Sequence, residues 1–132
     1  MIGRLVPLVL LPRYTTLVGG GDDANAFATI GIDVSPYDVA LVTVWRGAIL
    51  GDAPPTPPPT VEPFRVWFEE STDQETWNEC FVSPSEHDPG ENTQVRYEAL
   101  LTKRWLRLRV ELEAANNIAT CFAVGFLQER TR

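Results

Sequence analysis

The stretch that most constrains the fold is residues 105–113, in which apolar and charged side chains alternate without interruption. An extended strand points successive side chains to opposite faces, whereas a helix would distribute the same leucines around its circumference. The apolar set is Leu106, Leu108, Val110 and Leu112, and the charged set is Arg107, Arg109, Glu111 and Glu113. The segment is therefore predicted to be a β-strand with one face in a core and the other in water.

Apolar segments bounded by turn residues recur along the chain and predict further short strands. These segments are residues 4–11, 14–18, 27–34, 39–50, 64–69, 77–82, 93–100 and 118–128. Phe64, Val66 and Phe68 share one parity, so we expect them to enter the same core as the leucines of residues 105–113. The valine-rich residues 39–50 suit a central strand. This spacing is typical of an all-β fold, and it predicts a single antiparallel β-sandwich, jelly-roll-like, of about eight strands.

Two segments depart from this pattern and are expected to lie at the periphery. Residues 51–60 contain five prolines, which exclude a helix or a sheet ladder, so residues 51–63 are predicted to form an extended, proline-rich loop. Residues 1–12 are apolar but short, and Pro7 interrupts them. They are predicted to form an N-terminal arm that suits an edge or added strand better than a central one.

Length and charge restrict the class of protein. The 132 residues, 44% of them hydrophobic, are enough for one domain with a substantial core and too few for two. The formal net charge of -7 argues against a nucleic-acid partner, since phosphate recognition requires a cationic surface. No run of residues is long enough to span a bilayer, and residues 1–11 lack the features of a cleaved signal peptide. We therefore expect no membrane partner and synthesis in a host cytoplasm.

Catalytic, metal and cofactor sites have little support in the sequence. His87 is the only histidine, and Ser85, His87 and Asp88 are neighbours in one polar loop rather than groups converging from separate elements. The aspartates have no EF-hand spacing, and the Gly19 to Gly21 run lacks the residues of a phosphate loop. We expect a chain that is not an enzyme and that binds no metal or cofactor.

Two cysteines, Cys80 and Cys121, are too few for a disulfide framework. Free, buried thiols are the favoured interpretation, and a single bridge between two strands is the alternative.

A motif at residues 71–77, Ser-x-Asp-x-x-x-Trp, follows one predicted strand and is itself followed by an aromatic-x-Arg-x-Arg strand at residues 105–109. Over residues 64–113 this order resembles the second half of discoidin-like (F5/8 type C) sandwiches. It also resembles small β-sandwich structural proteins of tailed phages that decorate the head or join parts of the virion. Locally, Ser71 and Asp73 are expected to hydrogen-bond within the turn, and Trp77 to pack over the hairpin into the core.

These observations lead to one expected function and one alternative. The phage resemblance implies a non-enzymatic virion structural protein, a capsid decoration or accessory protein whose partners are other virion proteins and copies of itself. The discoidin resemblance implies a carbohydrate-binding module instead. The expected contact elements are the N-terminal arm, the proline-rich loop and two tryptophans whose parity turns them outward, although a loop could cover either tryptophan. The candidate contact residues are Leu5, Val9, Leu11, Pro54, Pro57, Trp67 and Trp105.

Overall fold

The structure is a computed structural model that describes residues 4–19, 25–50, 64–112 and 117–130. In these residues the regular elements are ten β-strands. They are β1 (Leu5–Val18), β2 (Asn25–Ala28), β3 (Ile32–Asp33), β4 (Tyr37–Arg46), β5 (Phe64–Ser71), β6 (Asn78–Glu79), β7 (Val82–Ser83), β8 (Thr93–Leu100), β9 (Trp105–Leu112) and β10 (Ile118–Glu129).

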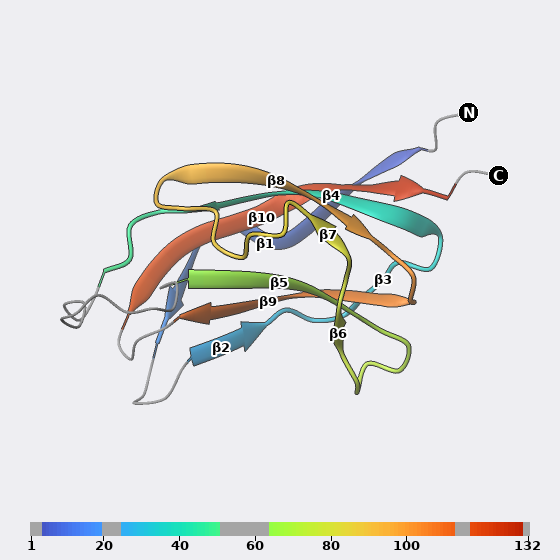
Figure 1. Cartoon of the computed structure of the whole chain (residues 1–132), viewed down its shortest axis with the longest axis horizontal. Coiled ribbons are helices and arrows are strands. Elements are labelled where there is room, and N and C mark those ends of the chain that lie inside the picture. Colours follow the sequence, from blue (N-terminus) through green and yellow to red (C-terminus); the bar gives the residue numbers. More distant parts are fainter. Residues whose placement is uncertain (1–3, 20–24, 51–63, 113–116, 131–132) are drawn as a thin grey trace.

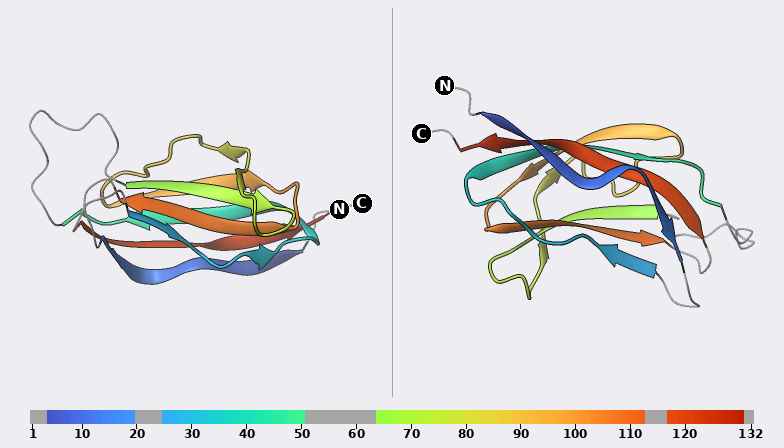
Figure 2. Two further views of the ribbon diagram at one scale, coloured as in Figure 1. Left: turned by 90° about the horizontal axis from the view of Figure 1, so that it is seen from below. Right: turned by 180° about the vertical axis from the view of Figure 1, so that it is seen from behind.

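The strands form two antiparallel sheets, which confirms the predicted β-sandwich (Figure 1). Sheet A has the order β1-β10-β4-β8-β7, and sheet B has the order β2-β9-β5-β6, with β3 also paired to β9. The valine-rich strand β4 is central in sheet A, as expected, and β1 lies at its edge. The two ends of the described chain lie side by side, since the Glu129 amide donates to the Arg4 carbonyl oxygen at 2.8 Å (Figure 2).

The core lies between the sheets and contains the residues that the alternating segments predicted. The predicted inward residues of β5 and β9 are all at most 2% exposed: Phe64, Val66, Phe68, Leu106, Leu108, Val110 and Leu112. Sheet A contributes small and branched side chains such as Val42, Val44 and Ala123, together with Tyr97, whose ring centroid lies 5.4 Å from that of Phe68. The alternation of buried and less buried residues is regular along β4 and β9.

Strand boundaries differ from the sequence prediction where pairing partners change. The predicted strand 27–34 is divided into β2 and β3, which pair with successive parts of β9. The two N-terminal segments join into the single strand β1, whose pairing with β10 shifts register between Val9 and Leu11 and again between Leu11 and Thr15. These irregularities bend β1 and reverse the face to which a given parity points.

The hairpin after β5 also differs from the prediction. Residues 77–82 do not form one return strand, because β6 pairs with β5 in sheet B whereas β7 pairs with β8 in sheet A. The predicted insertion of Trp77 into the core is wrong. Its ring is half-buried on the outer side of sheet B, where the Arg107 guanidinium carbon lies 4.3 Å from the ring centroid.

The turn at the start of the motif is built as predicted. The Ser71 hydroxyl oxygen accepts the amides of Asp73 and Gln74, and an Asp73 carboxylate oxygen accepts those of Glu75 and Thr76. The hydrogen bonds that the Asp73 carboxylate accepts from the Thr76 and Glu75 amides and from the Ser71 hydroxyl lower the pKa of Asp73 below its usual value.

Candidate functional site

The outer faces of the two sheets differ in chemistry, and the contrast locates the candidate site. The outer face of sheet B is charged and internally paired. Glu69 of β5, whose side chain is 10% exposed, accepts from Arg107 Nε at 2.9 Å and from Arg109 Nε at 3.1 Å. Glu111 accepts from Arg65 at 3.1 Å and also pairs with Arg109. This face therefore satisfies its own charges.

The two candidate tryptophans lie on the sheet B side, outward as their parity predicted, but neither is an open platform. The guanidinium carbons of Arg109 and Arg65 lie 4.1 Å and 5.0 Å from the Trp67 ring centroid, and the His87 ring centroid is 5.2 Å away. Arg104 lies 5.0 Å from the Trp105 ring centroid. Side chains of the same chain already stack on both rings.

The loop that carries the only histidine is held by a different set of contacts. Arg46, at the end of β4, forms two hydrogen bonds with the Asp88 carboxylate, at 2.9 Å and 3.0 Å, and both side chains are nearly buried. His87 Nε2 lies 2.9 Å from a Glu79 carboxylate oxygen. Asp88 therefore pairs with Arg46 and does not orient His87. The loop links β4 of sheet A, through Arg46, to β6 of sheet B, through Glu79.

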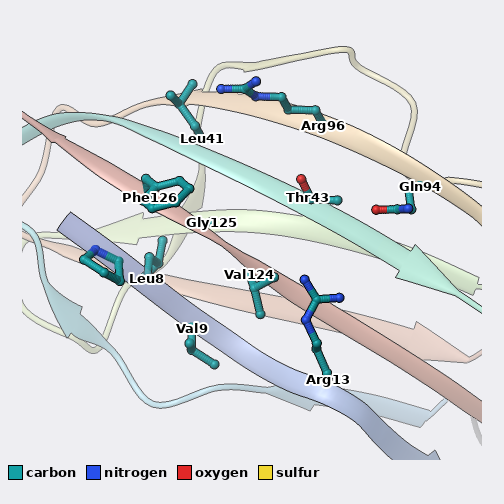
Figure 3. Close-up of a pocket in the computed structure, with 11 residues that line it drawn as sticks. Leu8, Val9, Arg13, Leu41, Thr43, Gln94, Arg96, Val124, Gly125 and Phe126 are labelled. Atoms are coloured by element: carbon teal, nitrogen blue, oxygen red, sulfur yellow. The ribbon is translucent and has the colours of Figure 1, made fainter. Parts of the chain in front are cut away.

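The outer face of sheet A carries an apolar patch. Val9 of β1 is 55% exposed and Phe126 of β10 is 46% exposed. Their cross-strand neighbours, Val124 and Leu41, are half-buried. These four residues line a surface groove with a volume of about 550 Å³ (Figure 3). Such a patch on a sheet that nothing in the described chain covers is the feature most typical of a contact surface.

Four polar residues also line the groove: Arg13 and Gln94 lie at the end away from Phe126 and Leu41, and Thr43 and Arg96 lie in the cross-strand row of Val9 and Val124. Arg13, Arg96, Gln94 and Thr43 belong to its lining and come from β1, β8 and β4 (Figure 3). The Arg13 guanidinium carbon lies 4.6 Å from the ring centroid of Phe122. The Phe122 ring in turn stacks on Trp45, at 5.7 Å and 19° between ring planes. Arg13 is thus positioned by aromatic stacking rather than by a carboxylate.

Gly125 belongs to the lining of this groove. A Cβ atom built at this position would overlap the backbone carbonyl oxygen of Leu41 on the neighbouring strand β4. The position therefore requires glycine, because the backbone of β4 occupies the space that a side chain at residue 125 would take.

The candidate contact residues of the N-terminal arm have different positions. Leu5 and Val9 point outward and are 48% and 55% exposed. Leu11 differs from them, because the register shift after Val9 turns it inward, where it is half-buried against the core. The arm itself is not free, since β1 pairs with β10 along its length. Pro54 and Pro57 lie outside the described residues.

Sequence reasoning missed Leu41, Val124 and Phe126, although a signal was present. Residues 118–127 are apolar at nearly every position, on both parities, which is typical of a strand covered on both faces. One face of β10 covers the core, and the other forms the groove.

Both cysteines are free and buried, as expected. Burial, with the charges of Glu70, Glu79 and Glu69, raises the pKa of Cys80 to about 12, and burial raises that of Cys121 to about 11. The thiols are therefore held in their neutral form within the core.

No protein-family model, curated protein or solved structure matches this chain. The proposed function therefore rests on the geometry of the described residues. Within the described ranges, no group of three or more His, Cys, Asp or Glu side chains is arranged to hold a metal ion. The same residues include no helix long and apolar enough to cross a membrane.

Proposed function

We propose that this chain is a non-enzymatic virion structural protein, a capsid decoration or accessory protein, that acts through protein–protein contacts. Its contact surface is the outer face of sheet A. The observation that carries the proposal is the contrast between the two outer faces, because sheet B pairs its own charges whereas sheet A presents Val9, Val124 and Phe126 to solvent. Burial of such a surface against a partner is the usual source of association free energy.

The position of the groove within the fold suits a structural role. It lies on four paired strands, so a partner would meet a rigid surface and little conformational entropy would be lost on docking. Leu5 and Val9 extend the apolar surface along β1 to the edge of the sheet. The N-terminal segment therefore contributes to the proposed contact as part of the sheet, through its outward side chains.

The carbohydrate-binding alternative has weaker support. Sugar recognition uses an aromatic ring with an open face beside polar side chains, and Trp67 and Trp105 are the outward tryptophans that could supply such a ring. Arginines of the same chain stack on both of them. We therefore favour the structural role.

The proposal is tested by incorporation into particles. Purified particles of the source virus should contain the chain at a fixed ratio to the major capsid protein, as measured by quantitative mass spectrometry. Phe126→Ser combined with Val9→Ser should lower that ratio at least tenfold, since both side chains lie on the proposed contact face. Ile30→Ser is the matched control because Ile30 is 88% exposed but lies outside the groove.

The same assay tests the absence of a catalytic role. His87→Ala should leave incorporation and particle infectivity within twofold of the parent. Absence of the parent chain from particles would overturn the structural role, and loss of infectivity in a stable, fully incorporated His87→Ala variant would overturn the non-enzymatic one.

A further inference from the structure

The groove on sheet A is amphipathic along its length, and this restricts what can occupy it. Phe126 and Leu41 lie at one end and Arg13 and Gln94 at the other, and the row between them consists of Val9, Val124, Thr43 and Arg96 (Figure 3). An occupant of matching chemistry needs apolar groups at one end and hydrogen-bond acceptors at the other.

The arginines of the groove differ from most others in the described residues. Six arginines have a carboxylate partner within 4.0 Å: Arg4, Arg46, Arg65, Arg104, Arg107 and Arg109. Arg13, Arg96 and Arg130 have none among the described side chains, and two of these three line the groove. On a chain with a formal net charge of -7, acidic groups are abundant, yet no described one is paired with these two cations.

From these features we infer that the groove binds an apolar segment of a partner protein that carries at least one Asp or Glu side chain. The inference rests on the proposed function and specifies the chemistry of its partner. Arg13 on β1 and Arg96 on β8 lie on opposite sides of the groove, so a carboxylate of the partner would accept charge-assisted hydrogen bonds from the nearer of the two, and its apolar side chains would cover Val124 and Phe126.

Two details of the site favour a carboxylate in the groove. Arg13 is held over Phe122 by stacking, which orients its guanidinium before a partner arrives. Gln94 and Thr43 supply further donors to the groove, from strands β8 and β4.

The probe is a displayed library of random dodecapeptides, selected on the parent protein and counter-selected on a Val124→Glu variant, which places a charge in the apolar part of the groove. Enriched peptides should combine apolar residues with an excess of Asp and Glu over the unselected library. Synthetic versions should bind at least tenfold more weakly to the Arg13→Gln/Arg96→Gln variant by fluorescence anisotropy. Arg130→Gln, the described arginine without a carboxylate partner that lies outside the groove, should leave the dissociation constant within twofold.

Three results would overturn the inference. Enrichment of neutral or basic peptides, or equal binding to the parent and to Arg13→Gln/Arg96→Gln, would remove the role of the two arginines. Failure to enrich any peptide that distinguishes the parent from Val124→Glu would remove the groove as a peptide site. A dimer of the parent by analytical ultracentrifugation that Arg13→Gln/Arg96→Gln dissociates would identify a second copy as the occupant. Each of these results is distinct from failure of the structural role, which is decided by the presence of the chain in particles.

Discussion

The ion pair between Arg46 and Asp88 fixes the loop of residues 84–92 to the end of β4, and Asp88→Asn should destabilise the whole domain. The two hydrogen bonds measure 2.9 Å and 3.0 Å, and the side chains are 8% and 11% exposed. Asp88 also accepts the Gly90 amide at 2.9 Å. Asparagine keeps the shape and one acceptor oxygen but removes the charge and turns an NH2 group toward a guanidinium donor.

The expected magnitude follows from the burial of both partners. Removal of one member of a buried pair leaves the other as an uncompensated charge and costs about 3–5 kcal/mol. A domain of this size has a free energy of unfolding of roughly 5–15 kcal/mol, so the variant should lose a large fraction of its stability. Exposed pairs contribute no more than about 1 kcal/mol.

Urea denaturation followed by tryptophan fluorescence measures this difference. Glu129→Gln is the matched control, since its pair with Arg4 has side chains 36% and 73% exposed, and it should change the free energy of unfolding by less than about 1 kcal/mol. Arg46→Met/Asp88→Leu should recover much of the loss, because it removes both charges beside the Phe64 ring, which lies 5.8 Å from the Arg46 guanidinium carbon. An Asp88→Asn protein as stable as the control would show that the pair is hydrated and that the reasoning from burial is wrong.

Two further predictions concern the core and the groove. The pKa values of Cys80 and Cys121 are raised from about 9 to about 12 and about 11 in the folded chain. Above about pH 9 the unfolded chain therefore releases thiol protons that the folded chain retains. The free energy of unfolding should consequently fall between about pH 9 and 11. Urea titrations across that range test this, and Cys80→Ala/Cys121→Ala should flatten the slope; an unchanged slope would refute it. Gly125→Ala should cost about 1–3 kcal/mol or more in the same assay, since its methyl group meets the Leu41 carbonyl oxygen, and a variant of parental stability would show that β10 and β4 can separate.

The sandwich was predictable from the sequence where one face of a strand is apolar and the other charged. Leu106, Leu108 and the inward residues of β5 are buried as their parity required, because a slip of one residue would exchange the core and solvent faces. Trp67 was likewise correctly placed outward. Parity could not reveal what covers its ring, since Arg109 comes from a strand more than forty residues away.

Errors arose where local pattern and tertiary pairing disagree. Leu5, Val9 and Leu11 share one parity, but a register shift in β1 turns Leu11 toward the core. A bulge of this kind depends on how β1 fits β10 and has no mark in either sequence segment alone. Trp77 is predicted to pack into the core, whereas its ring lies on the outer side of sheet B in contact with Arg107 of β9.

The candidate groove depends on the same kind of long-range pairing. Its lining comes from β1, β4, β8 and β10, and antiparallel pairing places outward residues of these strands next to one another. β10 is apolar on both parities, yet only one of its faces covers the core. Since exposure of the other face to water has a free-energy cost, the pattern favours a protein whose second apolar face is covered by a partner. The proposed contact surface therefore combines a sequence signal, the apolar residues on both parities of β10, with a position that only the fold supplies.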